Sequence, residues 1–326
     1  MKPICAVAVN GKDITKAVET GLVSINTNDE AGFQSDTVKV VIADPRKEIA
    51  LPSKGATMDV YLGFVHTGAS HVGTYTVDTV GRAGKPSSLT ISGKGADLTG
   101  NSKLKQQKTR SFDNITIGAL VEKLAGEHGL KAAVGEDFKA MQIAHLDQVD
   151  ESDMNLLTRV ANDHGAIFKP ADGHLVFAAK GQGKTVTGKV LPTITVTEDM
   201  CSEWNVEIAE RTNYKSVVAY WQDAAAGARK EVKVGEGEPV FTIRKPYADE
   251  AAAQAAAKAK QADLDRGTGA ATFTLSVGEP SAFAESPLAL SKFDPELDGR
   301  WVAAKVSHSF SGSGFTTSIE AEPPTA

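Results

Sequence analysis

The side chains that could bind phosphate lie in a glycine-rich segment that lacks the rest of a phosphate-binding loop. The segment reads GQGKT from Gly181 to Thr185, so it offers backbone N–H groups, a lysine and a hydroxyl. The motif requires a glycine five residues before Gly183, where this chain has Ala178, and a helix afterwards. Strand-like residues and Pro192 follow instead. A hairpin turn is therefore the better interpretation.

Two further glycine-containing segments also fall short of a cofactor or catalytic motif. GKGADL, which begins at Gly93, lacks the third glycine of a dinucleotide-binding fingerprint. FSGSGF, around Ser313, lacks the G-x-S-x-G pattern of a nucleophile elbow and fits a hairpin. We therefore predict neither a nucleotide site nor a serine nucleophile at these positions.

The seven histidines show no arrangement that would hold a metal ion. They contain no HExxH pattern and are not spaced with Cys5 or Cys201 as zinc ligands would be. His308 stands on the apolar face of a predicted strand, so we interpret it as a core or interface histidine whose ring nitrogens have partners. The seven are His66, His71, His128, His145, His164, His174 and His308.

The densest group of carboxylates lies around the start of a predicted helix. Its members are Asp147, Asp150, Glu151 and Asp153. Paired carboxylates can hydrolyse glycosides or bind a metal ion, but the helix dipole already favours negative charge at a helix N-terminus. The sequence therefore predicts no catalytic, cofactor-binding or metal-binding residue, no cofactor and no enzymatic activity.

The helix at this carboxylate group is the clearest local element of the sequence. Ser152 is its predicted N-cap, and Gly165 is its predicted end in the left-handed conformation. Its apolar residues recur at the spacing of one helical face. They are Met154, Leu157, Val160 and Ala161.

Two other helices are predicted. One has Thr116 or Asn114 as its N-cap and a Schellman ending at Gly129 and Leu130. The other is the alanine-rich stretch at about 248–265, which has acidic residues at its start and Arg266 near its end. Alanine permits close approach, so we expect this helix to lie across a sheet or a subunit contact.

Composition excludes several classes of protein. The 326 residues carry a net charge of -6, which argues against specific nucleic-acid binding, because that function needs a concentrated basic face. The basic cluster from Lys103 to Arg110 is interpreted as a solvated face. Two distant cysteines fit a reducing compartment. No apolar run is long enough for membrane insertion, and no cleaved signal is recognisable.

The remaining pattern predicts an α+β fold that is mainly β. Short strands of period two fill residues 1–100 and return in 191–326, as expected for two antiparallel β-barrel-like domains. An α+β module of residues 101–190 stands between them, and the long alanine-rich helix belongs to the last domain. The two β-domains are of similar size and could be structural cousins.

The order of several loose motifs resembles the phage late control protein D family, the tail or baseplate hubs of contractile-tailed phages and R-type bacteriocins. That family is related to the N-terminal part of the type VI secretion spike VgrG. Gln148, Ser152, Asp153, Leu157 and Gly165 occupy the family's Q-x-x-x-S-D-x-x-x-L segment and the glycine after it. The matching segments, in family order, are VNGKDIT, LPSKGATMDVYLGF, VGTYTVDTV, KTRSFDNITIGALVEKLAGEHGL, QVDESDMNLLTRVANDHGAIFK and LDGRWVAAKVSHSFSGSGFTTSIEAE.

This resemblance implies a mechanical function. Such hubs are homotrimers in which two β-barrel domains per chain form a ring of six similar barrels, joining the six-fold tail tube to the three-fold central spike. The implied partners are a second and third copy of the chain, a tail spike protein, the tail tube protein, the tape-measure protein and baseplate wedge proteins. The implied location is the tail baseplate of a virion or bacteriocin particle, after assembly in the bacterial cytoplasm.

Some alternatives stay open at this point. The segment from Val277 to Gly299 departs from the family pattern, so its local hairpin is undetermined. The chain lacks the oligosaccharide-binding domain and β-helical needle of VgrG, which implies a separate spike protein. A VgrG-like spike component, a hub with cell-wall-degrading activity and a carbohydrate-binding β-protein are the competing functions.

Overall fold

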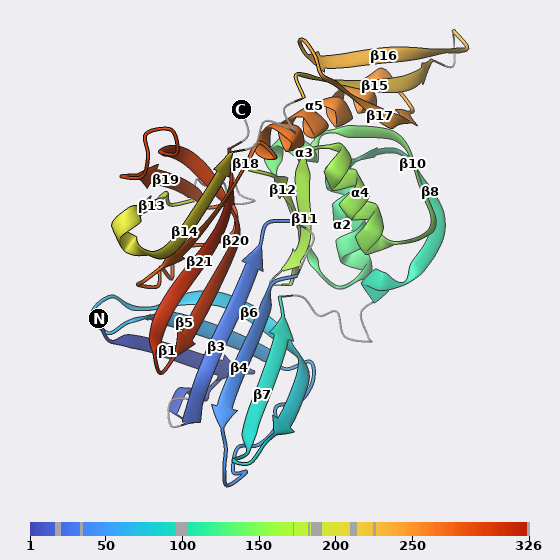
Figure 1. Ribbon diagram of the computed structural model, residues 1–326. Helices are drawn as coiled ribbons and strands as arrows, with labels where there is room; N and C mark the ends of the chain where they lie inside the picture. The colour runs from blue at the N-terminus through green and yellow to red at the C-terminus, as the bar shows by residue number, and fades with distance from the viewer. Residues whose placement is uncertain are drawn as a thin grey trace.

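The computed structural model describes residues 1–16, 21–32, 35–95, 103–171, 173–181, 183, 191–208, 214–223 and 226–324. It is rich in strands and has few helices, so the predicted fold class, α+β and mainly β, is confirmed (Figure 1). None of the helices in these ranges has both the length and the apolar character needed to cross a membrane.

One large sheet runs through both ends of the chain. Its N-terminal strands are β1 (Pro3–Val9), β2 (Lys12–Asp13), β3 (Leu22–Glu30), β4 (Thr37–Ala43), β5 (Thr57–Phe64), β6 (Gly68–Ala83) and β7 (Ser88–Lys94). Its C-terminal strands are β13 (Ile194–Thr197), β14 (Cys201–Ile208), β18 (Gly269–Leu275), β19 (Pro287–Ser291), β20 (Gly299–Ser311) and β21 (Gly314–Glu322). The order is β14-β18-β21-β20-β3-β4-β7-β6-β5-β1-β2; off this path, β19 pairs with β20, and β13 pairs with β19.

The two halves of this sheet meet where β3 and β20 pair in antiparallel fashion. The register places Ile25 opposite Phe310 and Thr27 opposite His308. Ile25 and Phe310 share a core with the N-terminal strands, whereas a separate cluster of buried side chains fills the C-terminal half. A strand from the start of the chain and one from its end are thus hydrogen-bonded neighbours (Figure 1).

The two halves repeat one strand order. Strands β3, β4, β7, β6 and β5 pair successively in the N-terminal half, and β14, β18, β21, β20 and β19 pair successively in the C-terminal half. Their order along the chain also matches, because β3, β4, β5, β6 and β7 correspond in turn to β14, β18, β19, β20 and β21. The expectation that the β-regions are structural cousins is confirmed at the level of topology.

A compact α+β module follows the first half. Its helices are α2 (Ile117–Glu127), α3 (Glu136–Lys139) and α4 (Asp153–Asp163), after the short 3-10 helix η1 (Lys103–Lys105). A long two-stranded ribbon consists of β8 (Gln107–Thr116) and β10 (Gln142–Ser152), and a three-stranded sheet consists of β9 (Lys131–Val134), β11 (Ala166–Ala171) and β12 (His174–Ala179). The module has its own buried core.

The helix ends predicted for this module are confirmed. Ser152 accepts a hydrogen bond from the backbone N–H of Asn155, and Gly165 has a φ of 64°. Thr116, rather than Asn114, caps α2, because its hydroxyl accepts from a backbone N–H three residues on. The hydrogen bond from the Leu130 N–H to the Ala125 carbonyl closes the Schellman ending.

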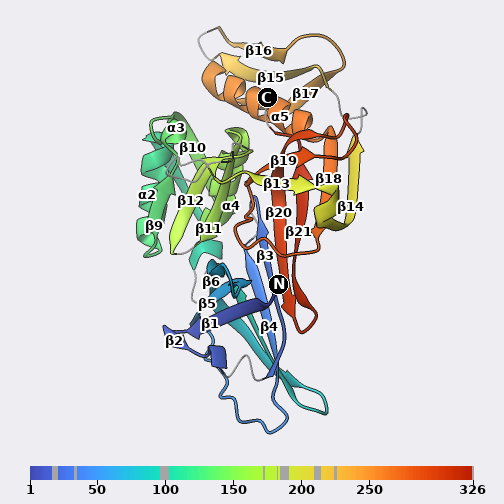
Figure 2. The same ribbon diagram turned by 90° about the vertical axis from the view of Figure 1, so that its left-hand side faces the viewer.

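A further three-stranded sheet lies apart from the large one. It consists of β15 (Ser216–Asp223), β16 (Ala228–Gly235) and β17 (Val240–Tyr247), and α5 (Glu250–Arg266) lies along one of its faces (Figure 2). The long alanine-rich helix therefore lies across a sheet, as predicted. Val218 and Tyr220 fall within the range 191–326 that is predicted to form one β-barrel-like domain, but they belong to this smaller sheet, because alternation alone does not identify a strand's partner.

The predicted domain boundaries near residues 100 and 190 stay predictions. Both fall within or next to stretches outside the described residues, namely 96–102 and 184–190.

Replacing Leu157 by Ala is expected to lower the free energy of unfolding by about 2 to 5 kcal/mol, because Leu157 is fully buried and the truncation leaves a cavity. Urea denaturation of the whole chain measures this change. Asn155→Ala is the matched control, because Asn155 lies exposed on the same helix. Equal effects of the two changes would contradict the burial of this face.

Candidate functional site

A buried carboxylate, that of Asp153, is the centre of the most highly connected polar cluster in the described chain. Its oxygens lie 2.6 Å from Lys108 Nζ and 2.7 Å from Arg110 Nη2, both on β8. His128 Nε2, just after α2, is 2.7 Å away. Gln148 Nε2, on β10, donates at 2.8 Å. The cluster therefore ties α4 to the ribbon and to the end of α2.

Glu127 supplies a second carboxylate to the same two cations. It lies 2.9 Å from Lys108 Nζ and 2.8 Å from Arg110 Nη1. The fully buried Gln148 completes the network, since its carbonyl oxygen accepts from Arg110 Nε at 2.8 Å. Every charged group of the cluster thus has a partner of opposite sign.

The electrostatics keep both carboxylates ionised. Burial works to raise the pKa of Asp153, but hydrogen bonds from Lys108, Gln148 and His128 outweigh it and lower the pKa to about 2. Burial also works to raise the pKa of Glu127, but hydrogen bonds from Arg110 and Lys108 outweigh the effect of burial and lower that pKa. A general acid at neutral pH needs a raised pKa, so these groups are suited to holding structure and not to proton transfer.

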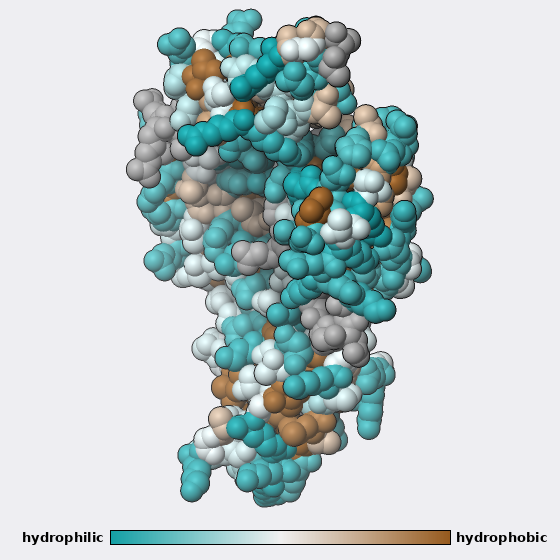
Figure 3. All heavy atoms as spheres, turned by 90° about the vertical axis from the view of Figure 1, so that its right-hand side faces the viewer, coloured by the Kyte–Doolittle hydropathy of each residue, from teal (hydrophilic) through white to brown (hydrophobic). Residues whose placement is uncertain are grey.

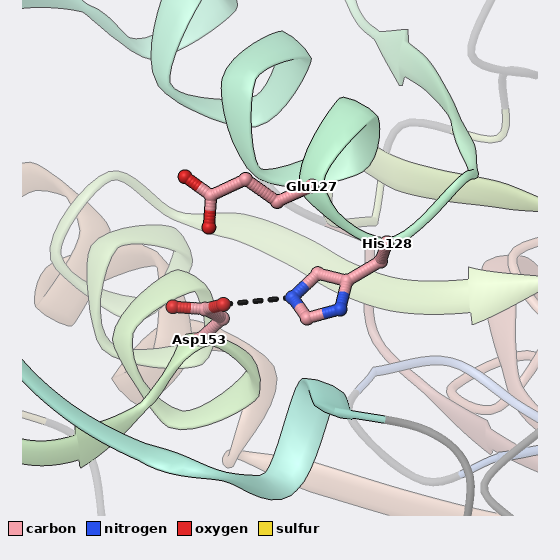
Figure 4. Close-up of side chains that lie close together, drawn as sticks. All are labelled: Glu127, His128 and Asp153. Atoms are coloured by element: carbon pink, nitrogen blue, oxygen red, sulfur yellow. Dashed lines mark hydrogen bonds and ion pairs between the residues drawn. The ribbon is translucent and has the colours of Figure 1, made fainter.

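A metal ion does not fit this cluster. Glu127, His128 and Asp153 each direct a potential ligand atom to one small region, with these atoms within 4.8 Å of one another (Figure 4). The same carboxylates, however, already pair with Lys108 and Arg110. A cation could bind only by displacing two positive side chains, which like-charge repulsion opposes.

A second polar cluster joins the module to the large sheet. Lys169 Nζ, on β11, lies 2.9 Å from an oxygen of Asp29 and 2.9 Å from an oxygen of Asp36. The other oxygen of Asp29 accepts from the backbone N–H of Ala284 at 2.8 Å. One carboxylate of β3 thus holds both the α+β module and the loop before β19.

The two aspartates of this junction differ in protonation. Burial and the negative charge of Asp29 raise the pKa of Asp36 to about 7, even though Lys169 works to lower it. Burial works to lower the pKa of Lys169, but the negative charges of Asp29 and Asp36 outweigh the effect of burial and raise that pKa. The junction therefore holds one firm ion pair, with Lys169 permanently charged.

The module also packs against α5. A Cβ on Gly165 would lie 3.4 Å from the Cβ of Ala259, so the turn after α4 and the alanine-rich helix are in direct contact. Asp163 receives hydrogen bonds from the Tyr247 hydroxyl at 3.3 Å and from Lys245 Nζ at 3.1 Å. A cleft of about 1,090 Å³ remains between β10, α4 and α5.

The interpretation of His308 is confirmed. It is buried, with Nδ1 2.9 Å from the Thr317 hydroxyl and Nε2 3.2 Å from the Ala282 carbonyl oxygen. Burial lowers its pKa to about 4, so the ring is neutral.

The predicted glycine turns are only partly described. Ser313 lies in the hairpin between β20 and β21, as predicted. Gly93 belongs to β7, whereas the rest of GKGADL from residue 96 lies outside the described residues. Gln182, Lys184 and Thr185 of the GQGKT segment also lie outside them.

The carboxylate group predicted at one helix start is divided in the structure. Asp147, Asp150 and Glu151 belong to β10, and only Asp153 is in the helix. Glu151 pairs with Arg159 at 2.8 Å. The predicted absence of catalytic, cofactor and metal residues stays a prediction.

Part of the basic cluster was misassigned to a solvated face. Lys108 and Arg110 pair with a fully buried carboxylate, because β8 places residues two apart on one side of the ribbon. In the sequence, this pairing is indicated only by the two-residue spacing of Lys108 and Arg110 and by the polar residues Gln148 and Asp153 later in the chain. Their pairing needs the β8–β10 register, which puts Arg110 opposite Gln148.

Asp153→Asn is expected to lower the free energy of unfolding at pH 7 by about 3 to 5 kcal/mol, because it leaves two cations short of an anion in a buried site. Since the pKa of Asp153 is lowered by folding, its ionised form stabilises the chain above about pH 4, and that advantage fades as pH falls toward 2. Denaturant unfolding at several pH values measures both effects.

Asp150→Asn is the control for this change, because Asp150 is exposed and accepts from the Thr109 hydroxyl, which an amide oxygen can also do. A difference between wild type and Asp153→Asn that did not shrink at low pH would contradict the ionised assignment.

Known proteins of one family are similar to this chain over nearly its whole length. The family model described as phage tail baseplate hub (GPD) matches residues 48–314. A probable baseplate hub protein of Escherichia phage 186 is 30% identical over 364 residues, with 99% of this chain and 93% of that protein covered.

Solved structures of other proteins have a fold similar to that of this chain. The tail protein of Neisseria meningitidis MC58 has a TM-score of 0.72 at 16% identity, covering 99% of this chain and 97% of that one. The Escherichia coli c3393 protein, a component of the type VI secretion system, has a TM-score of 0.57 at 10% identity, covering 94% and 74%. The predicted resemblance is confirmed by the family model and the phage 186 relative: the chain belongs to the phage tail baseplate hub (GPD) family.

Proposed function

We propose that this chain is the structural hub of a tail baseplate and that three copies form an adaptor between a six-fold tail tube and a three-fold central spike. The observation that carries the proposal is the internal repeat of the large sheet. Each chain holds two β-units of one strand order, so three chains present six similar units. A trimer of this kind has three-fold symmetry overall and approximate six-fold symmetry in its sheets.

The junctions between the parts of the chain support a mechanical role. The two β-units share a continuous strand ladder, and Lys169 joins the α+β module to it through a partly buried ion pair with Asp29. Separating the partners of such a pair leaves a poorly solvated charge, so the parts resist relative movement. A rigid adaptor can hold a tube and a spike in fixed register while a tail contracts.

The partners follow from this role. We propose the tail tube protein on one side of the ring, the tail spike protein on the other, and the tape-measure and baseplate wedge proteins as further neighbours. The particle is a phage virion or a bacteriocin, assembled in the bacterial cytoplasm. The 30% identity to a phage baseplate protein favours a phage-type tail over a type VI secretion spike.

We propose no enzymatic activity. The carboxylates of the buried Asp153 and the more exposed Glu127 are ionised and paired with cations, so neither supplies the protonated acid that glycoside hydrolysis needs. Incubation of the purified chain in a peptidoglycan gel tests this directly. Clearing of the gel by the wild-type chain would contradict the proposal.

The mass of the purified chain in solution is expected to be three times its 34.2 kDa, because a hub must present three equivalent copies. Light scattering after size-exclusion chromatography, with and without the proposed tail spike protein, measures this. The Leu157→Ala variant serves as a control for loss of fold. A chain that stays monomeric under both conditions would contradict the hub role.

A further inference from the structure

The two β-units match in register as well as in strand order. In β3, the pairing with β4 shifts between Leu22 and Ser24. In β14, the pairing with β18 shifts between Cys201 and Glu203. Both shifts skip one residue at the first step of the strand, so a bulge stands at the same place in each unit. β14 is therefore the counterpart of β3, and Ser24 corresponds to Glu203.

The long strands β6 and β20 correspond in the same way. The β6–β7 pairing shifts between Val77 and Thr79, and the β20–β21 pairing shifts between Ala303 and Lys305. Val77 exchanges backbone hydrogen bonds with residues 55 and 56, and Ala303 does so with residues 285 and 286. Gly55 and Glu285 both have positive φ, 83° and 68°. The correspondence extends to backbone conformation.

The equivalent strands differ in what covers their edges. In β20, residues 305–311 pair with β21 on one side and with β3 on the other. In β6, residues 79–83 pair with β7 on one side, and among the described residues no strand pairs with the other. β14 is likewise the end of the sheet path in the described chain, with only β18 beside it. Within the described ranges, each chain thus has one uncovered edge at β6 and one at β14.

The loop beside the uncovered edge of β6 is held in the same way as its counterpart beside β20. Arg82 hydrogen-bonds the carbonyl oxygen of Ile49 in the loop before β5. Its counterpart His308 hydrogen-bonds the carbonyl oxygen of Ala282 in the loop before β19. There, β3 pairs with β20 despite the loop. The same loop position in the N-terminal unit is therefore compatible with an added strand.

We infer that β14 of one chain pairs in antiparallel fashion with residues 80–83 of β6 in a neighbouring chain, so that the β3–β20 junction is repeated between copies. Transferring the observed register places Val80 opposite the neighbour's Ile208 and Arg82 opposite its Val206. Such head-to-tail pairing covers both the β14 edge and the β6 edge of every chain once a ring closes. This pairing rests on the proposed hub function and names the surface by which it assembles.

The side chains at the two edges are compatible with this pairing. Ile208 is 60% exposed at the end of β14, although its neighbours on that face, Trp204 and Val206, pack into the core. Val80 is only partly buried against the N-terminal core. Pairing would bring the two apolar side chains together, as cross-strand neighbours on one face. Figure 3 shows hydrophobic atoms gathered over the lower, N-terminal part of a mainly hydrophilic face.

A cysteine pair tests the register. In the chain carrying both Val80→Cys and Ile208→Cys, mild oxidation is expected to give covalent dimers and trimers on a denaturing gel, because directly opposed residues approach within disulfide range. The single variants control for Cys5 and Cys201. The pair Val80→Cys with Glu207→Cys is the matched control, because successive residues of a strand point to opposite faces.

A charge placed at the edge tests the contact without changing the core. Ile208→Arg is expected to weaken trimer formation at least about tenfold, because pairing would bury an unpaired charge. Val149→Arg is the control, since Val149 is 64% exposed but lies on β10, away from both edges. Sedimentation at several concentrations measures association, and circular dichroism checks the fold.

The outcomes separate this pairing from the hub role itself. The pairing is supported if the wild-type chain is a trimer, if the chain with Val80→Cys and Ile208→Cys crosslinks while the control pair does not, and if Ile208→Arg dissociates the trimer. A wild-type trimer that Ile208→Arg leaves intact, with no crosslink at that pair, overturns the pairing and leaves the hub role standing. A wild-type chain that is monomeric, together with no crosslink in the Val80→Cys/Ile208→Cys chain, overturns both.

Discussion

The antiparallel pairing of β3 with β20 is the constraint on which the rest of the structure depends. It joins residues 24–30 to residues 305–311, so the chain must return to its beginning before its large sheet is complete. Loop-closure entropy makes such distant pairing unfavourable until the intervening elements are formed. The α+β module and the small sheet with α5 are therefore insertions between, or within, two β-units that must meet.

The polar groups nearest this junction hold the insertions to it. Asp29, on β3, accepts from Lys169 of the module and from the loop before β19. His308, opposite Thr27 across the junction, is buried and neutral, so the pairing places no uncompensated charge in the core. The Asp153 cluster performs the same task inside the module, where two cations and two carboxylates fix α4 against the ribbon.

Local features of this fold were predictable from the sequence, and long-range pairings were not. The caps at Ser152 and Thr116 and the turn at Gly165 depend on residues within one helical turn, so residue type alone predicts them. Lys108 and Arg110 could not be assigned to Asp153, because their contact depends on the register of two strands about forty residues apart. The matching bulges of β3 and β14 are likewise invisible in sequence, since the backbone repeats while the side chains differ.

We propose that two similar β-units in each chain, repeated head to tail, make a closed ring for a tail. Electron cryomicroscopy of the chain assembled with its tube and spike proteins tests this most directly. The account predicts three copies around the tail axis and six β-units in a continuous ladder, with β14 of each chain beside β6 of the next. A ring whose copies touch only through the α+β modules, with both sheet edges uncovered, would contradict it.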